Sequence, residues 1–471
     1  MKKLFILSLI ICIILLSQSA YTQNTDYKSV TGSWLGKLST GGIDLRIVFN
    51  ISLTGKDTLM ATLDSPDQGA KNIKMGTVTY TGTSLRIVAP MMLAEYNGTI
   101  KNDTLIEGTW KQAGNSLPLN IVKLKAAFTI FRPQEPRPPF PYTSEDVMFK
   151  NDKFNIKLAG TLTTPPGKGP FPAVILITGS GSQNRNEELM GHKPFAVIAD
   201  YLSRNGIAVL RFDDRGVGKS QGTPYNATSA DFVSDVEAAF NFLKNNPSVN
   251  QKSIGLIGHS EGGLIAPISA STNKEIAFIV SLAGPGVIGE QIIHTQSAEI
   301  NRLSGVDETE IEESVSINKK LFAILKKEED NNKASEKMLA AYKKILIKKK
   351  TSTEETEKSL KQIQQSLNPA GLTWFRYFII TDPSVFWKKV TCPVLALNGA
   401  KDLQVAADEN LQAIEKALKS GGNRNYKILK LEGLNHLFQH SEKGLPSEYG
   451  NIEETFSPEA LKIISDWILG L

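Results

Sequence analysis

Residues 253–266 read Ser253-Ile254-Gly255-Leu256-Ile257-Gly258-His259-Ser260-Glu261-Gly262-Gly263-Leu264-Ile265-Ala266. The apolar run 254–257 is typical of a strand buried on both faces. A Gly-x-Ser-x-Gly pattern and an apolar, helix-like segment follow it. This succession of strand, sharp turn and helix predicts a nucleophilic serine, Ser260, at the tip of a strained turn. A glycine-rich turn with an incidental serine is the alternative, and the pattern alone does not decide between them.

A nucleophilic serine needs a general base within hydrogen-bonding reach and a carboxylate that orients this base. Of the five histidines in the chain, His436 directly follows the last predicted strand, whereas His440 is expected on the next turn. Asp402 follows a buried strand and a glycine turn, whereas Asp408 is better explained as a helix-start residue. The order serine, aspartate, histidine is the order required where a serine turn of this kind lies on a parallel sheet. The sequence therefore predicts the catalytic triad Ser260, Asp402 and His436.

Attack of a serine on an acyl carbonyl creates an oxyanion, which needs two backbone N–H donors. We expect Glu261, at the start of the helix after the serine, to supply one of them. The loop Gly179-Ser180-Gly181 follows the apolar run that ends at Ile177. We expect this loop to supply the other donor from Ser180 or, as the second choice, from Gly181. Only backbone groups are used, so the sequence predicts no role for the Glu261 side chain.

Apolar strands alternate with helical patterns from about residue 143 to the end of the chain. This alternation predicts a mostly parallel, doubly wound sheet covered on both faces. The predicted strands are 171–177, 206–212, 254–257, 276–282, 394–398 and 426–431, after a strand pair within 145–164. The predicted helices are 194–205, 228–245, 408–419 and 458–469. Residues 285–389, about a hundred, are helical in character, and we expect them to form a lid over the carboxyl ends of the strands.

Four motifs together resemble bacterial α/β-hydrolase esterases, in particular those grouped with the serine aminopeptidase-like hydrolases. The motifs are GHSEGG at 258–263, LRFDDRGVGKS at 210–220, NGAKD at 398–402 and GLNH at 433–436. The resemblance covers residues 145–471. It implies an α/β-hydrolase fold and a serine carboxylesterase that cleaves small-molecule acyl esters through an acyl-enzyme, without a cofactor. It also implies a structural role for Asp213 and Arg215, and aromatic packing or pocket lining for 373–378.

An aminopeptidase or amidase with the same triad is the alternative among enzymes. It would need carboxylates that hold a free amine, and the lid contains acids whose position the sequence does not give: Glu308, Glu310 and Glu312. Natural substrate, acyl-chain length and oligomeric state are not readable from the sequence.

Short alternating strands separated by turns from 31 to 126 predict a small antiparallel β-barrel or sandwich domain. Gly32-Ser33-Trp34 and Gly108-Thr109-Trp110 resemble the opening and closing strands of a lipocalin-like barrel. We expect an accessory domain, and a ligand-binding protein on a hydrolase scaffold is the alternative from another class. Five prolines in 131–142 predict a stiff extended linker, or a loop packed against one of the domains, before the catalytic domain 143–471.

Residues 1–20 differ in kind from the rest of the chain. Two lysines, an apolar run over 4–16 and small residues to Ala20 predict a secretory signal peptide, and hence a periplasmic or extracellular protein without a membrane span after its removal. Removing the two lysines from 53 basic residues leaves 51 against 48 acidic ones, a balance that does not suggest a nucleic-acid partner. Cys12 leaves with the signal peptide, so Cys392 remains alone and neither a disulfide nor a metal site is expected.

Overall fold

The computed structural model describes residues 27–40, 43–55, 57–68, 70–112, 114–126, 128, 131–349 and 352–471. The chain divides into two compact units. The first runs to Ser65 and includes Lys71–Phe128, and the second comprises Pro66–Ala70 and Thr129–Leu471. The predicted signal peptide lies outside the described residues. Within the described ranges, no helix combines the length and the apolar character that crossing a membrane requires.

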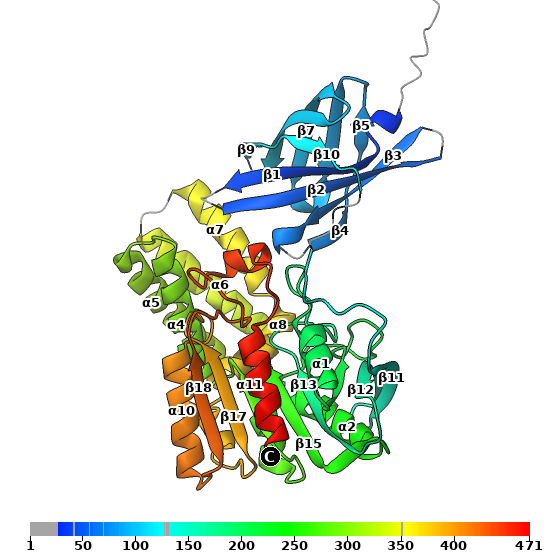
Figure 1. The fold of residues 1–471 in the computed structure, drawn as a ribbon. Coiled ribbons are helices and arrows are strands. Elements are labelled where there is room, and N and C mark those ends of the chain that lie inside the picture. Colours follow the sequence, from blue (N-terminus) through cyan, green and yellow to red (C-terminus); the bar gives the residue numbers. More distant parts are fainter. Residues whose placement is uncertain are drawn as a thin grey trace, which may run out of the picture. The chain divides into compact units, whose positions relative to one another are not determined.

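The first unit is a curled antiparallel sheet, ten-stranded in its described part, which confirms the predicted barrel or sandwich (Figure 1). Its strands are β1 (Gly32–Thr40), β2 (Ile43–Thr54), β3 (Thr58–Ser65), β4 (Ala70–Lys74), β5 (Val78–Tyr80), β6 (Ser84–Ala89), β7 (Ala94–Asn102), β8 (Leu105–Gln112), β9 (Asn115–Pro118) and β10 (Ile121–Lys123). They are hydrogen-bonded in the order β4-β3-β2-β1-β10-β8-β7-β6-β5, with β9 paired to β8. Its core is built around Trp34, Phe49, Tyr96 and Trp110.

The strand that closes this sheet differs from the prediction. Gly108-Thr109-Trp110 lies in β8, but β10 stands between β8 and β1 and pairs with both. Ile121 of β10 is fully buried and lies opposite Gly36 of β1. A Cβ atom at Gly36 would come within 2.8 Å of the Ile121 side chain, so the bare glycine is what admits the short closing strand.

The second unit contains an eight-stranded, mostly parallel sheet, as the sequence predicts. Its strands are β11 (Thr143–Asn151), β12 (Ile156–Thr164), β13 (Phe171–Ile177), β14 (Ala208–Phe212), β15 (Val249–His259), β16 (Ile279–Leu282), β17 (Val394–Gly399) and β18 (Tyr426–Leu431). Their order is β11-β12-β14-β13-β15-β16-β17-β18. The hairpin β11–β12 joins β14 antiparallel, and the remaining pairs are parallel. The carboxyl ends of the parallel strands therefore meet at one edge of the sheet.

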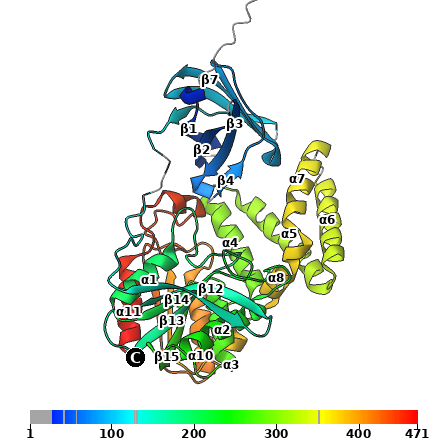
Figure 2. The same ribbon diagram turned by 90° about the vertical axis from the view of Figure 1, so that its right-hand side faces the viewer.

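Helices cover both faces of this sheet (Figure 2). One face packs on α1 (Pro194–Arg204) and α11 (Pro458–Leu469), and the other packs on α2 (Ser229–Lys244), α3 (Gly262–Thr272) and α10 (Ala407–Ser420). Successive residues of a strand point to opposite faces, and here both faces are buried. This is why the central strands appear in the sequence as continuous apolar runs rather than as an alternating pattern.

A helical insertion, residues Gly289–Trp387, connects β16 to β17. Its helices are α4 (Gly289–Leu303), α5 (Glu308–Lys327), α6 (Asn331–Lys348), α7 (Thr353–Ser366), α8 (Pro369–Ile380) and α9 (Ser384–Trp387). Side-chain oxygens of the preceding residue accept backbone N–H groups at the starts of four of them: Asp307, Asp330, Ser352 and Asn368. The helix starts are thus encoded locally. Because the insertion leaves β16 at its carboxyl end, it begins at the edge where the predicted site residues lie.

The proline-rich segment 131–142 packs against the rest of the second unit instead of standing free as an extended linker. The guanidinium group of Arg132 is buried and donates to three backbone carbonyls, those of Met190, Gly450 and Ile452. The Gln134 amide donates to the carbonyl of Phe456, and the Tyr142 hydroxyl donates to Asp200. Of the two alternatives that the proline content left open, a stiff extended linker and a loop packed against a domain, these hydrogen bonds show the packed loop.

Candidate active site

A sharp turn places Ser260 between β15 and α3. The φ angle of Ser260 is +53°, in the left-handed region that a non-glycine residue adopts at an energetic cost. A Cβ atom on Gly258 would lie 2.1 Å from the carbonyl oxygen of Gly262, and one on Gly262 would lie 2.2 Å from that of Ile177. Both distances are far below van der Waals contact. The two glycines of the motif therefore permit the close crossing that pushes the Ser260 side chain out above the sheet.

Asp402 and His436 come together after the ends of β17 and β18. Nδ1 of His436 lies 2.8 Å from Oδ2 of Asp402. The other carboxylate oxygen accepts the N–H groups of Gln404 and Val405, each at 2.8 Å. Both side chains are buried, with 5% of His436 and none of Asp402 exposed. The carboxylate is thus fixed by three donors, and it fixes the imidazole in turn.

The loop that carries His436 is held by its neighbour Asn435, which is completely buried. The side-chain oxygen Oδ1 of Asn435 accepts the backbone N–H groups of Leu437 and Gln439, both at 3.0 Å, and its side-chain NH2 group donates to the side-chain oxygen of Gln439. The N–H of Lys401 donates to the carbonyl of Leu434, which links this loop to the one that carries Asp402. The two loops therefore form one rigid support.

Ser260, His436 and Ser180 line a single cavity of about 260 Å³. Side chains of the helical insertion complete its wall, among them Ile292 from α4 and Phe378 from α8. The predicted nucleophile, the predicted base and one predicted oxyanion donor thus line the same cavity, and Asp402 contacts the base.

The loop predicted to supply an oxyanion donor is tied down at its start. The N–H of Gly179 donates to Oε1 of Glu187 at 2.7 Å and is therefore engaged. Ser180 lines the cavity of Ser260, whereas Gly181, with φ +99°, lines a neighbouring cavity. Of the two candidates, Ser180 is the one on the side of Ser260.

Comparison with known proteins shows which families have similar sequences. Residues 192–348 match the model of a family described as serine aminopeptidase, S33, and this region includes the turn at Ser260. Esterase EstD of Thermotoga maritima is 29% identical over 294 residues, which cover 62% of this chain and 61% of the esterase. The sheet order and helix layers of the second unit are those of an α/β-hydrolase fold, as the sequence predicts.

Other relatives share shorter stretches with this chain. Acyl-coenzyme A thioesterase 1 of Mus musculus is 32% identical over 130 residues, 27% of either chain. The chain spans about three-fifths of the length of the Thermotoga relative and less of the mouse one. The solved Pyrococcus furiosus esterase Pf2001 has a TM-score of 0.42 and 19% identity, over 70% of this chain and 93% of that one.

Two buried residues that the sequence did not single out support the candidate site. Nδ1 of His259 lies 3.0 Å from Oε1 of Glu187, and its Nε2 lies 3.0 Å from the carbonyl oxygen of His436. Burial lowers the pKa of His259, but the charge and hydrogen bond of Glu187 outweigh it and raise this pKa above its ordinary value. Since both partners are acceptors, a doubly protonated imidazole satisfies both. The pair ties the loop at Gly179 to the loop at His436, far apart in sequence.

The side chain of Glu261 also has a place that the sequence did not reveal. Its Oε1 accepts the Ser229 hydroxyl at 2.6 Å and the indole N–H of Trp374 at 2.8 Å. Burial raises the pKa of Glu261, and hydrogen bonds from Ser229, Trp374 and Ser180 oppose this rise. Trp374 belongs to α8, so the carboxylate joins the helical insertion to the turn of the nucleophile.

Asp213 and Arg215 form buried ion pairs away from Ser260, in line with the structural role that the resemblance implied. Oδ2 of Asp213 lies 2.8 Å from the guanidinium of Arg185, and Nε of Arg215 lies 2.7 Å from Asp235. The pairs brace the loop after β14 against its neighbours.

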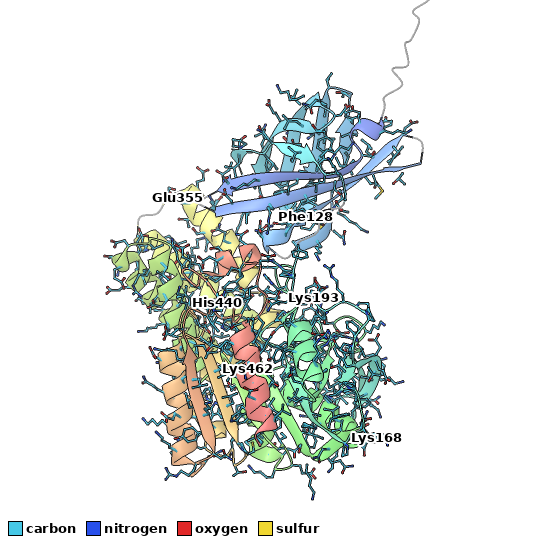
Figure 3. All side chains as sticks on the ribbon, viewed as in Figure 1. Phe128, Lys168, Lys193, Glu355, His440 and Lys462 are labelled. Carbon is cyan, nitrogen blue, oxygen red and sulfur yellow. The ribbon has the colours of Figure 1, made fainter. Side chains whose placement is uncertain are left out.

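Other polar groups considered from the sequence stay outside the site. The acids of α5, namely Glu308, Glu310 and Glu312, are exposed. His440, labelled in Figure 3, is exposed and pairs with Glu454, so it does not compete with His436 as the base. Asp408 binds Lys430 in the first turn of α10. Within the described ranges, no three His, Cys, Asp or Glu side chains are grouped as a metal ion would require.

The buried carboxyl group of Asp214 should make the stability of the fold depend on pH. Burial raises the pKa of Asp214 from 3.8 to about 7, although the N–H of Gln183 and the hydroxyl of Thr178 bond to it. Between these two pH values the folded protein binds the proton and the unfolded chain does not. The stability that the Asp214 carboxyl group contributes is therefore complete below about pH 4 and is lost as the pH rises to about 7. Over this range the free energy of unfolding falls by at most about 1.4 kcal/mol per pH unit.

We expect Asp214→Asn to remove this contribution. Urea unfolding of both proteins from pH 4 to 8 measures it as the difference between their stability profiles. Asp152→Asn is the control, because Asp152 is exposed, and it should reproduce the wild-type profile. Parallel profiles for wild type and Asp214→Asn would contradict the prediction.

Proposed function

We propose that this protein is an exported serine hydrolase that cleaves carboxylic esters through an acyl-enzyme intermediate. The observation that carries the proposal is the 2.8 Å contact between Asp402 and His436 beside a cavity that His436 shares with Ser260. The similarity to an esterase supports the same class of substrate. Export rests on the signal peptide predicted in residues 1–20.

In the proposed mechanism the Oγ atom of Ser260 attacks the ester carbonyl carbon, and His436 takes the hydroxyl proton. Asp402 keeps the imidazole oriented and stabilises its positive charge. The N–H groups of Glu261 and Ser180 bind the oxyanion. Collapse of the intermediate breaks the ester C–O bond, and His436 gives its proton to the departing alcohol. Water then attacks the acyl-enzyme, with His436 again as the base, and releases the acid and Ser260.

The helical insertion is proposed to act as the lid of this site. Ile292 and Phe378 reach the cavity of Ser260 from two of its helices. We expect these side chains to exclude part of the water from the bound ester, which would strengthen the hydrogen bonds to the oxyanion.

An ester is preferred over a peptide with a free amino terminus. An aminopeptidase needs carboxylates free to bind the amine, and the acids of α5 are exposed. Glu187, which lines the cavity, is already engaged by Gly179 and His259. Amine recognition therefore has no free carboxylate among these groups.

The proposal is tested with the protein lacking residues 1–20. We expect turnover of short-chain 4-nitrophenyl esters and covalent labelling of Ser260 by a fluorophosphonate, located by peptide mass spectrometry. We also expect an acetyl ester to be cleaved much faster than an aminoacyl 4-nitroanilide. If the protein shows no turnover and no labelling, the enzyme proposal is wrong and a binding protein on a hydrolase scaffold remains. Faster cleavage of the anilide than of the ester would indicate an aminopeptidase. Export is tested on protein recovered from outside the cytoplasmic membrane, from which we expect the first residues to have been removed.

A further inference from the structure

A second, larger cavity lies next to the one that contains Ser260. It has a volume of about 620 Å³, against about 260 Å³ for the cavity at Ser260. Its wall is largely apolar and combines the α2 side of the sheet with the helical insertion, including Phe232, Leu321, Phe322, Met338, Leu367 and Leu372. Cavities of 300–1,000 Å³ are typical of sites for drug-sized ligands. The larger cavity reaches this size and the cavity at Ser260 does not.

The two cavities share one side chain in their walls. Within the described part of the chain, Trp374 is the residue that lines both of them. The backbone beside it divides in the same way, since Ser180 lines the smaller cavity and the next residue, Gly181, lines the larger one. We call this partition, made by Trp374 and the Ser180–Gly181 backbone, the Trp374 wall.

The Trp374 ring is fixed on two sides. Its indole N–H donates to Oε1 of Glu261 at 2.8 Å, and Glu261 is only 2% exposed. On the other side the ring stacks on Phe378, with ring centroids 5.4 Å apart and planes inclined by 12°. A buried hydrogen bond to a carboxylate and an aromatic stack together favour one orientation of the ring. Glu261 is therefore the anchor that keeps the wall closed.

We propose that Trp374, anchored by Glu261, determines substrate specificity by limiting the hydrocarbon chain of the ester to what the cavity at Ser260 holds. The larger apolar cavity then stays beyond reach of a substrate bound at Ser260. This inference rests on the proposed ester hydrolysis. Its consequence is that wild type prefers short-chain esters, although a volume suited to long chains lies directly behind the wall.

Removing the wall should join the two cavities. We expect Trp374→Ala to raise the ratio of kcat/KM for a dodecanoyl ester to that for a butyryl ester at least tenfold, because the methylene groups beyond the cavity at Ser260 would then be buried in the larger apolar cavity. Two substrate series measure this shift: 4-nitrophenyl esters of increasing acyl length, and acetates of increasing alcohol length followed by acid release. A shift in either series supports the wall and shows which part of the ester it limits.

Two further variants distinguish an effect of the Trp374 wall on chain-length preference from a general effect of changing the helical insertion. Met338→Ala enlarges the larger cavity but leaves Trp374 in place, so it should keep the wild-type preference. Trp374→Phe keeps a ring but loses the N–H bonded to Glu261, and it should shift the ratio partially. A Trp374→Phe profile equal to that of wild type would overturn the role of Glu261 as the anchor.

Fluorophosphonate labelling of Ser260 in each variant shows whether the site itself is intact. Wild type that cleaves dodecanoyl and butyryl esters equally well, or a Trp374→Ala variant that is labelled but unshifted in both series, would overturn the wall. Absence of labelling and turnover in wild type would instead refute the proposed function.

Discussion

Replacing Ser260 by alanine should lower kcat for 4-nitrophenyl acetate by about 10⁴-fold or more, while KM changes little. The variant loses the Oγ atom that attacks the carbonyl carbon, and the oxyanion donors alone leave only a residual acceleration over water. Alanine and serine meet a similar cost at the positive φ of this turn, so the melting temperature should stay close to that of wild type. Steady-state kinetics, fluorophosphonate labelling and calorimetry on the same preparations measure the three quantities.

The control for Ser260→Ala is Ser271→Ala, in the helix α3 that follows Ser260. The Ser271 hydroxyl donates to the carbonyl of Ile268 within α3 and does not line the cavity at Ser260. This variant should retain turnover and labelling. Full activity in a Ser260→Ala preparation that is free of wild-type protein would remove Ser260 from the mechanism.

Replacing Asp402 by asparagine should lower kcat by about 10⁴-fold with the fold intact. The asparagine oxygen can still accept the N–H groups of Gln404 and Val405, so its amide nitrogen would face Nδ1 of His436. The amide is a donor, and it would force the imidazole proton onto Nε2. That tautomer has no lone pair directed at Ser260 with which to take its proton.

Asp408→Asn is the matched control, because Asp408 was the other acid near the same strand end. Asp408 is paired with Lys430 on the surface and should be replaceable without loss of kcat. The rate of fluorophosphonate labelling gives an independent readout, which we expect to fall with kcat in Asp402→Asn alone. Equal losses in both variants would mean that Asp402 has no special relation to His436.

Much of the fold was predictable because its signals are local. Buried parallel strands produce continuous apolar runs, and β13 and β18 begin and end where the sequence predicts. The starts of the insertion helices carry capping residues such as Asp330. The closing strand of the first unit was predicted wrongly, because β10 is only three residues long and its position depends on pairing with β1 and β8.

The candidate site was also predictable only where its signals are local. Ser260, Asp402 and His436 each follow a strand in a recognisable turn, so their order along the chain sufficed to nominate them. The pairing of Glu187 with His259 did not emerge, since the two residues lie 72 positions apart in the chain. Pocket lining or aromatic packing was expected for 373–378, but the bond from Trp374 to Glu261, 113 positions away, was not. No local pattern distinguishes a buried glutamate that binds a histidine from one that faces water.

The sequence by itself therefore determined the strand and helix succession, the glycines that the nucleophile turn needs and the three residues nominated for catalysis. These depend on backbone sterics and on the period of apolar residues, which neighbouring positions carry. The tertiary structure alone decided that Glu261 bonds to Trp374, that the proline-rich segment is anchored by Arg132, and that a wall divides two cavities. Such contacts arise only when distant segments pack together, because burial then makes each polar group find whichever partner the fold has brought within reach.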